Sequence, residues 1–499
     1  MAHPNRASES LLARFIRGAI SVGMGSLSII AFGFLSMLLA VRHLPAEDYG
    51  AFVLLQVVAG FLVEISALGL TLSVPKFLAD TEDRTIQSEL VSSVIIFRIV
   101  TIAGISLVAV AARNTLLSLF DATLLLDLLL FIPVLVLTQG LAKLLRSILQ
   151  GLFAFKMVGA TDFISSLLNF VLVLFFVLLA HQSVLGLVYA KVISMGVSCV
   201  LAYLAIPVSK KWALNRALLT RVIRFGLPLQ VNYILTFIFL RVDTLIIGAL
   251  MGPAEIAYYE VARKIPENLT MAYEAFRVVF YPFIARFAAN GESDKAASFI
   301  NHSARWISLI TIFGALIAFL FGHEIIVLLF TEQYLPSVPA FILLMASLNL
   351  TLIDYTLGYS LVAVGDSSKP MIINTLHTTT NLVGNLLLIP ALGIIGAAIS
   401  SILGFVVTNP LNVWFLRRRG IPADAMFYVK PILIFVACAL LAAVLMPTLF
   451  LEKLLFAGLF LLGCLLLSVI VPADLMLLAR ETGAVLARKT RRGAARVEV

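Results

Sequence analysis

The sequence predicts an all-α protein that crosses a membrane with about fourteen helices. Of its 499 residues, 61% are hydrophobic and only 13% are charged, whereas an ordinary globular protein carries about 25% charged residues. The apolar residues also come in long runs, of which 432–446 has no charge at all. A helix needs about 20 mostly apolar residues to cross a bilayer, and backbone groups in lipid must bond within their own segment. Such runs therefore predict transmembrane helices.

The individual helices are predicted where apolar runs of this length lie between polar turns. In chain order, the predicted ranges are 18–40, 49–74, 91–112, 123–145, 160–180, 185–207, 226–250, 254–280, 303–322, 336–362, 371–390, 393–415, 431–449 and 454–476. With the N-terminus in the cytoplasm, 27 Lys and Arg fall in cytoplasmic segments and 3 in outside loops. Because Lys and Arg concentrate on the cytoplasmic side, both termini are predicted to be cytoplasmic.

The chain also repeats itself at a nearly constant offset. The tripeptide Pro-Ala-Glu at 45–47 recurs at 253–255, and Lys156 at the start of the fifth helix matches Lys369 at the start of the eleventh. Six helices per repeat give both halves the same orientation, so two six-helix lobes should form a parallel pseudo-two-fold repeat. The predicted organisation is a lobe at 1–207, a basic cytoplasmic linker at 208–225, a second lobe at 226–417, two extra helices at 418–476 and a basic tail at 477–499.

Cysteine use and net charge argue against several other classes of protein. The three cysteines, Cys199, Cys438 and Cys464, lie far apart in apolar runs, so we expect no metal site, no redox pair and no cofactor. The net charge of +9 gathers in the segments predicted to be cytoplasmic. Basic segments in such positions bind anionic membrane lipids. We therefore expect contact with the lipid surface, above all at 488–496, and no binding of nucleic acid.

Three sequence stretches resemble one family. They are RHLPAEDYGAFVLLQ from 42, EISALGLTLSVPKFLAD from 64 and FGLPLQVNYILTFIFLRVDTLIIGALMGPAEIAYYEVARKI from 225. Over most of residues 11–420 the chain is similar to polysaccharide-exporter flippases of the multidrug/oligosaccharidyl-lipid/polysaccharide exporter superfamily. The resemblance implies a V-shaped core of two six-helix lobes with two further helices. It also implies movement of undecaprenyl-diphosphate-linked oligosaccharide from the cytoplasmic to the periplasmic leaflet of the bacterial inner membrane, for O-antigen, capsule or exopolysaccharide synthesis.

Other functions remain as alternatives to this one. Lipid II flippases and ion-coupled multidrug exporters belong to the same superfamily, although lipid II flippases usually have a basic first helix and 23–36 carries no charge here. A membrane-embedded polysaccharide polymerase or ligase needs a sizeable outside loop, and the longest one predicted here is about 323–335. The chain also lacks the GxxxxGK[ST], HExxH and GxSxG motifs of nucleotide hydrolysis, zinc proteolysis and serine hydrolysis. We therefore predict a transporter and not an enzyme.

Basic residues within the predicted helices are the candidates for binding the substrate diphosphate. Charges at this depth are costly and usually face protein or water, and guanidinium groups grip phosphate oxygens in a fork. The candidates are Arg98, Lys143, Arg146, Lys191, Arg241, Arg263, Lys264 and Arg277. Lys143 and Arg146, three residues apart near a cytoplasmic helix end, would make the first contact with the phosphates. Their alternative role is simple anchoring of the topology.

Acidic residues in the predicted helices could bind a coupling ion or pair with the basic residues. These residues are Glu64, Asp243, Glu260, Glu267, Glu274 and Asp354. In the eighth helix, a set of polar residues follows spacings of three and four, which places them on one helical stripe. They are Glu260, Arg263, Glu267, Thr270, Glu274 and Arg277. The stripe either lines an aqueous cavity or forms a self-compensating ladder of ion pairs. Whether the coupling ion is H⁺ or Na⁺, or whether transport is uncoupled, is left open.

Further polar residues predict a cavity wall for the sugars. They are Asp162, Asn169, His377, Asn381 and Asn385, which fall on matching helices of the two repeats. Small polar residues also join helices to one another in membranes, and that role is the alternative. The predicted mechanism is alternating access, in which the lobes rock around the sugar-diphosphate head while the lipid tail stays in the bilayer. Other membrane proteins of polysaccharide assembly are conceivable partners.

Overall fold

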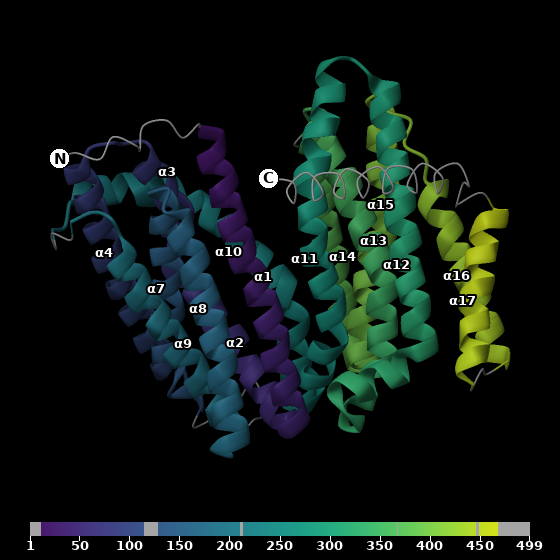
Figure 1. Ribbon diagram of the computed structural model, residues 1–499, viewed down its shortest axis with the longest axis horizontal. Helices are drawn as coiled ribbons and strands as arrows, with labels where there is room; N and C mark the ends of the chain where they lie inside the picture. The colour runs from purple at the N-terminus through teal and green to yellow at the C-terminus, as the bar shows by residue number, and fades with distance from the viewer. Residues whose placement is uncertain (1–10, 114–127, 210–212, 367, 446–448, 468–499) are drawn as a thin grey trace, which may run out of the picture. The chain divides into compact units, whose positions relative to one another are not determined.

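The computed structural model describes residues 11–113, 128–209, 213–366, 368–445 and 449–467 (Figure 1). The predicted tail at 477–499 lies outside the described residues, as do parts of the linker 208–225 and of the predicted helices 123–145 and 454–476. Within the described residues the secondary structure is helical, without a strand. This confirms the predicted all-α fold.

Over their described residues, the predicted ranges fall on the long helices of the chain, except that 49–74 is broken in two. The long helices are α1 Leu11–His43, α2 Ala46–Ala67, α4 Arg84–Ala111, α7 Ile132–Gly151, α8 Phe155–Leu174, α9 Val184–Ala205, α10 Arg216–Met251, α11 Pro253–Ala289, α12 Ser293–Phe330, α13 Val338–Ala363, α14 Ser368–Leu392, α15 Ile394–Arg418, α16 Met426–Leu445 and α17 Phe450–Leu466. Shorter segments are α3 Leu70–Ala79, a π-helical turn Phe175–Leu179 that continues α8, and a 3₁₀ turn Glu332–Ser337.

Many of these helices are apolar enough to cross a membrane. Among the described residues, ten helices meet that requirement, or eleven if the bent helix α10 is counted as one span. Helices α11 and α14 are more polar, and α17 has only 17 described residues. The chain is therefore an integral membrane protein.

The described helices group into two compact units. Unit 1 comprises 1–261, 326–337 and 385–397, and unit 2 comprises 262–325, 338–384 and 398–499. Unit 1 thus holds α1 to α10 with the start of α11, and unit 2 holds most of α11 to α17. The predicted lobe boundaries at 207 and 226 stay a prediction.

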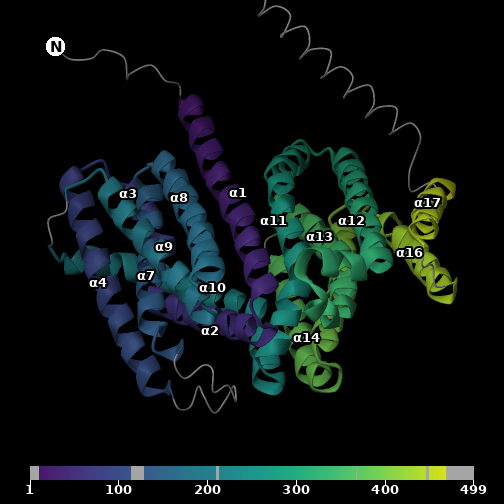
Figure 2. The same ribbon diagram turned by 60° about the horizontal axis from the view of Figure 1, so that its bottom comes forward.

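In unit 1, glycine lets α1 approach α8 closely along its length (Figures 1 and 2). A Cβ atom on Gly159 would lie 2.2 Å from the carbonyl oxygen of Ser21, and one on Gly25 would lie 2.9 Å from the Cα of Gly159. Small residues at a helix crossing permit such backbone contact in membranes. The two helices therefore form a tight seam, which becomes one wall of the cavity described below.

The second predicted helix, 49–74, is broken in the structure into α2 and α3. Leu68 and Gly69 adopt left-handed backbone conformations, with φ of 47° and 82°. The buried side chain of Gln230, in α10, bridges the break. Its Nε2 donates to the carbonyl of Glu64 at 2.8 Å, and its Oε1 accepts from the N–H of Gly69 at 3.1 Å. One side-chain amide thus satisfies two backbone groups near the break, as buried backbone polar groups require.

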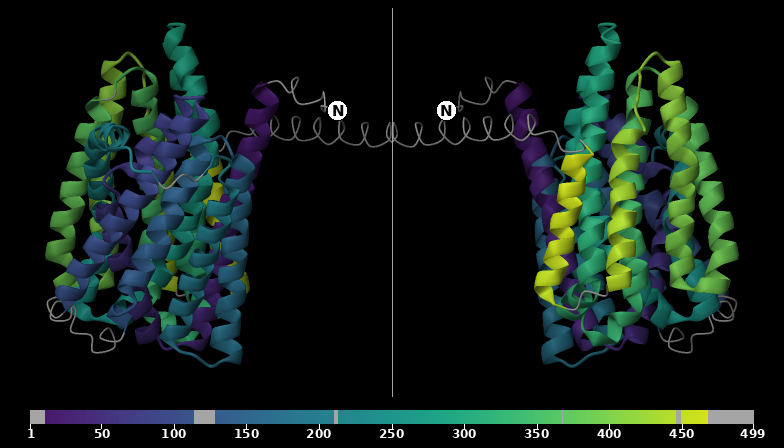
Figure 3. Two further views of the ribbon diagram at one scale, coloured as in Figure 1. Left: turned by 90° about the vertical axis from the view of Figure 1, so that its left-hand side faces the viewer. Right: turned by 90° about the vertical axis from the view of Figure 1, so that its right-hand side faces the viewer.

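Two of the apolar clusters in unit 2 each join several of its helices. One joins α11 to α16 through buried side chains that include Phe280, Ile353 and Leu416. In the other, α16 and α17 pack on α12, with Cys438 and Phe460 among the buried residues (Figure 3). The cysteines were predicted to lie in apolar helices. Cys438 lies in this apolar cluster of α12, α16 and α17 as a free thiol.

Several segments predicted to lie between helices contain helix in the structure, and 216–225 and 323–335 are two of them. Helix α10 begins at Arg216 and not near 226, because the Asn215 side chain accepts a hydrogen bond from the N–H of Leu218 at 3.1 Å and caps the helix. The predicted outside loop at 323–335 is also mostly helical. Helix α12 continues to Phe330, and the 3₁₀ turn follows it at once.

Candidate functional site

A cavity of about 350 Å³ opens within unit 1 among α1, α7, α8 and α9. Half of the polar side chains that line it were predicted as site residues. Those predicted residues are Lys143, Arg146, Asp162, Asn169 and Lys191. Gln139, Thr161, Ser165, Ser166 and Ser198 complete the polar lining. The volume lies within the usual range of small-molecule pockets, about 300–1,000 Å³.

Helical spacing explains why these side chains meet. Lys143 and Arg146 lie three residues apart in α7, so they share a face of that helix. In α8, Asp162 and Asn169 lie two turns apart, with serines between them, and form one polar stripe. Lys191 projects from α9 into the same cavity. Polar stripes on three neighbouring helices thus converge, which spares each of them contact with lipid.

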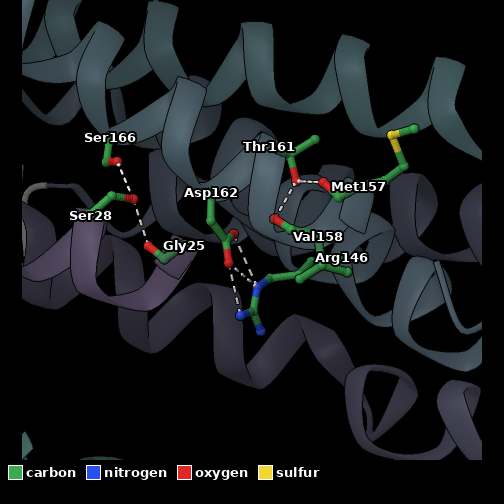
Figure 4. A network of polar contacts seen from close by, with 8 residues as sticks. All are labelled: Gly25, Ser28, Arg146, Met157, Val158, Thr161, Asp162 and Ser166. Atoms are coloured by element: carbon green, nitrogen blue, oxygen red, sulfur yellow. Dashed lines mark hydrogen bonds and ion pairs between the residues drawn. The ribbon is translucent and has the colours of Figure 1, made fainter. Parts of the chain in front are cut away.

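Arg146 and Asp162 form a forked ion pair across the cavity (Figure 4). The Nε atom of Arg146 lies 3.1 Å from both carboxylate oxygens of Asp162, and Nη2 lies 2.9 Å from Oδ2. The arginine side chain is 37% exposed and the carboxylate 10%. The guanidinium is therefore held in place by one anion and remains accessible to another.

Lys143 pairs with Glu64 of α2, which lies just before the break between α2 and α3. The Lys143 side chain is 49% exposed, whereas that of Glu64 is only 3% exposed. The Gln230 bridge fixes the backbone of Glu64, so the helix break positions the carboxylate that pairs with Lys143.

Hydroxyl and amide groups join the cavity helices at their seams. Asn169 donates to Ser36 of α1 and accepts from Ser194 of α9, both at 3.3 Å. Ser166 donates to Ser28 across the α1–α8 seam at 3.1 Å (Figure 4). Asn169 therefore both lines the cavity and joins helices, so the two roles predicted as alternatives coincide in this residue.

The charges of the cavity favour an anionic ligand. Three cations, Lys143, Arg146 and Lys191, face one lining carboxylate, Asp162. Even when Glu64 is counted, positive charges outnumber negative ones. A site with a surplus of fixed cations and several hydroxyl groups can replace the water around a phosphate group and hydrogen-bond its oxygens.

Arg98 is a predicted phosphate ligand that does not line this cavity. Its side chain, in α4, is fully buried at 0% exposure. It donates to the carbonyl of Val63 at 3.0 Å and to that of Gly140 at 3.4 Å. These bonds tie α4 to α2 and α7, so Arg98 supports the helices that carry Glu64 and Lys143.

Three further predicted residues of unit 1 meet near the junction of α10 and α11. Arg241 lies 3.6 Å from Glu260. Asp243 accepts a hydrogen bond from the hydroxyl of Tyr259 at 2.7 Å and one from the N–H of Thr244 at 2.7 Å. These residues stand apart from those that line the cavity.

In unit 2, the charged stripe of α11 is arranged in local ion pairs. Glu267 lies 3.7 Å from Arg263 and 3.6 Å from Lys264. One to two turns further on, Glu274 pairs with Arg277 at 2.6 Å. Pairs of the ladder that was predicted as an alternative to cavity lining are therefore present in α11. Glu260, at the start of the stripe, pairs with Arg241 of α10.

The other predicted polar residues are largely buried. Asp354 of α13 accepts hydrogen bonds from Thr408 at 3.0 Å and Asn412 at 2.8 Å, both in α15. The His377 ring stacks on Phe405 with centroids 4.1 Å apart. The two predicted asparagines, Asn381 and Asn385, are also buried. The side-chain amide of Asn381 lies 3.4 Å from the hydroxyl of Ser401. Asn385 belongs to unit 1.

Sequence reasoning missed Gln230, Thr408 and Asn412. Each is a neutral polar residue in a long helix, and none of them carries a charge that would mark it. Gln230 had one signal, its position two residues after Pro228 in an otherwise apolar stretch. Neutral polar residues in membrane helices usually find partners on other helices, but the sequence does not say which ones.

Known proteins share sequence or fold with this chain. A family model described as polysaccharide biosynthesis protein matches residues 38–339, more than half of the chain. A probable low-salt glycan biosynthesis flippase of Haloferax volcanii is 23% identical over 415 residues, covering 82% of this chain and 83% of that protein. The solved lipid II flippase MurJ, in an inward closed conformation, aligns with a TM-score of 0.70 at 14% identity, over 92% of this chain and 100% of that one. An inward-facing multidrug resistance transporter of the MATE family, described as a member of the MOP superfamily, aligns with a TM-score of 0.62 at 14% identity, over 81% and 98% of the two chains.

Proposed function

The chain belongs to the polysaccharide biosynthesis protein family, and from this premise we propose that it is a flippase for a lipid-linked oligosaccharide. The observation that carries the proposal is the cavity of unit 1, with Lys143, Arg146 and Lys191 in its wall. The similarity to a glycan biosynthesis flippase over most of both chains supports the same function.

We also propose which lipid, which glycan and which membrane are involved. The lipid is undecaprenyl diphosphate, and the glycan is destined for O-antigen, capsule or exopolysaccharide. The protein resides in the bacterial cytoplasmic membrane with both termini in the cytoplasm, and it moves the head group outward by alternating access. The charge distribution of the loops supports this orientation.

The cavity binds the diphosphate by exchanging one anion for another. Asp162 occupies the fork of Arg146, and the phosphate oxygens compete with that carboxylate for the guanidinium. Lys191 and Lys143 add positive charge around the same space. Such fixed cations replace the water and counterions that the phosphates lose when they leave the membrane surface.

The test is a leaflet-accessibility assay in proteoliposomes containing undecaprenyl diphosphate with a short labelled glycan. We expect the wild-type chain to move the label across the bilayer, and Lys191→Met to slow that movement at least about tenfold, which corresponds to ~1.4 kcal/mol in the barrier. Lys295→Met is the matched control, because Lys295 is an exposed cation paired with Glu292 away from the cavity. Wild-type rates in Lys191→Met, or no movement by the wild type, would refute the proposal.

Asp354 is the residue that we propose for ion coupling. It is buried in α13 and bonded by two neutral donors, and no basic side chain in the described part of the chain forms an ion pair with it. A carboxylate held in this way is available to a proton or Na⁺. Asp354→Asn should therefore abolish the response of flipping to a pH or Na⁺ gradient while leaving gradient-free flipping intact. A full gradient response in this variant would exclude the assignment.

A further inference from the structure

Unit 2 carries a partly exposed group of aromatic and charged side chains on α11 and α13. We call it the tyrosine face and define it as Glu274, Arg277, Tyr355 and Tyr359. The guanidinium carbon of Arg277 lies over the ring of Tyr359, 4.8 Å from its centroid. The rings of Tyr355 and Tyr359 are in contact, with centroids 6.4 Å apart. Two charges and two aromatic rings thus share one surface.

A fixed layer of side chains supports the tyrosine face. The Tyr273 ring lies beneath it, with its centroid 6.2 Å from that of Tyr355. The hydroxyl of Thr356 donates its proton to the carbonyl of Leu352 at 2.7 Å, so the hydroxyl of Tyr273 must donate to Thr356 at 2.8 Å. Tyr273 therefore has its polar group satisfied and acts as a support.

The outer tyrosines differ from Tyr273 in this respect. Within the described residues, the hydroxyls of Tyr355 and Tyr359 form no hydrogen bond, although both side chains are only partly exposed. Arg277 and Glu274 are also accessible, at 35% and 45% of their side-chain surfaces. Charges this exposed in a membrane-crossing helix are costly against lipid and indicate an aqueous surface. The tyrosine face therefore combines unused hydrogen-bonding groups, ring surfaces and water access.

We propose that the tyrosine face binds a sugar ring of the transported glycan, a subsite distinct from the phosphate-binding cavity of unit 1. The inference rests on the proposed flippase function. A pyranose ring presents C–H groups on its faces and hydroxyls at its edge. Tyrosine offers a rigid ring with a polar end, while the carboxylate of Glu274 and the N–H groups of Arg277 match the hydroxyls as acceptor and donors.

The charge balance explains why this face suits a sugar and not a phosphate. Arg277 is already paired with Glu274 at 2.6 Å, so one cation and one carboxylate cancel. A phosphate brought here would meet the carboxylate as well as the guanidinium, whereas a neutral sugar meets no such repulsion. In the cavity of unit 1 the cations outnumber the carboxylates. The tyrosine face therefore suits a neutral sugar, whereas the cavity of unit 1 suits a phosphate.

The experiment compares two substrates in the proteoliposome assay: undecaprenyl diphosphate with a short neutral glycan, and undecaprenyl diphosphate without sugar. Tyr359→Leu removes the ring, and Tyr359→Phe keeps the ring while removing the hydroxyl. We expect Tyr359→Leu to slow flipping of the glycan-bearing lipid by about tenfold, the order expected when an aromatic contact and its hydrogen bond are lost, and to leave the sugar-free lipid unchanged. Tyr359→Phe should slow the glycan-bearing lipid by a smaller factor, about two- to fivefold, because only the hydrogen bond is lost, and it should also leave the sugar-free lipid unchanged.

The possible results separate this inference from the proposed function. If the wild type moves neither lipid, the proposed function fails, and this inference fails with it. If the wild type moves the glycan-bearing lipid and Tyr359→Leu treats the two lipids alike, the inference alone is overturned. Size-exclusion profiles and melting temperatures of both variants show whether a lost rate reflects lost folding, and Tyr359→Phe keeps the test valid if Tyr359→Leu does not fold.

Discussion

Replacing Lys143 with methionine separates its ion pair with Glu64 from its proposed role in binding the phosphate. Methionine keeps the length of the side chain and removes its charge, which leaves the Glu64 carboxylate buried at 3% exposure without its partner. Orphaning a buried polar or charged group costs about 1–3 kcal/mol. The larger cost of about 3–5 kcal/mol for breaking a fully buried ion pair does not apply, because Lys143 is half exposed and its charge is partly screened by water.

A second substitution should restore stability without restoring transport. In Lys143→Met/Glu64→Gln no buried charge is left unpaired, so we expect the double variant to recover most of the loss. Flipping should stay slow in both variants, because the cation that faces the phosphate is missing. Glu64→Gln alone should behave in the opposite way: Lys143 keeps its charge, loses its internal counterion, and flips the lipid at least as fast as the wild type.

Melting temperatures in detergent and rates in the proteoliposome assay measure the two effects independently. Lys295→Met, which removes an exposed cation in unit 2, should change neither quantity. The reasoning is refuted if Lys143→Met flips the lipid at the wild-type rate, or if the double variant recovers transport together with stability. Either result would mean that Lys143 serves only to neutralise Glu64.

Three further predictions concern the supports of the fold. Gln230→Leu leaves two backbone groups unpaired near the break between α2 and α3, which costs about 1–3 kcal/mol for each group. Hydrogen exchange of the amides near the break, measured by mass spectrometry, should therefore become faster. Unchanged protection of these amides would contradict the bridging role of Gln230. Gly159→Ala should destabilise the protein by about 1–3 kcal/mol through overpacking. Gly196→Ala should not, because its Cβ would meet nothing within 4 Å. Equal melting temperatures of the two variants would count against the tight seam between α1 and α8. The Arg419 guanidinium beside Asp366 holds the pKa of that carboxyl below its usual value. The pair therefore stabilises above the unfolded-state pKa of about 3.9 and loses this effect as pH falls through the folded-state pKa. The difference in melting temperature between the wild type and Asp366→Asn should thus vanish in acid, and a constant difference would exclude this linkage.

The helices and part of the cavity could be predicted because they depend on local spacing. Apolar runs of bilayer length mark the long helices whatever their partners are. Lys143 and Arg146 had to share a face of one helix, as did Asp162 and Asn169, because residues three, four and seven apart always do. Such stripes must turn away from lipid, so their convergence on a shared cavity required only that the helices be neighbours.

The break between α2 and α3 could not be predicted in this way. The segment 49–74 is mostly apolar with Glu64 as its one charged residue, and it has the length of one span. What stabilises the break is Gln230, more than 150 residues further along the chain, whose side chain satisfies backbone groups near it. A gap in the hydrogen bonding of a helix is tolerated when a neighbour fills it, and the identity of that neighbour is a property of the tertiary fold.

Arg98 and Arg146 show why a basic residue at bilayer depth does not by itself identify a ligand site. Both are arginines in apolar helices, yet Arg98 is fully buried and donates to two backbone carbonyls. A phosphate could reach it only by separating α4 from α2 and α7. Arg146 is 37% exposed, and its partner is a single side-chain carboxylate. An incoming phosphate can replace that carboxylate without disturbing any backbone hydrogen bond. Under the proposed function, the cations that serve transport are those whose counterions can be exchanged, and the sequence alone does not distinguish them from those that hold helices together.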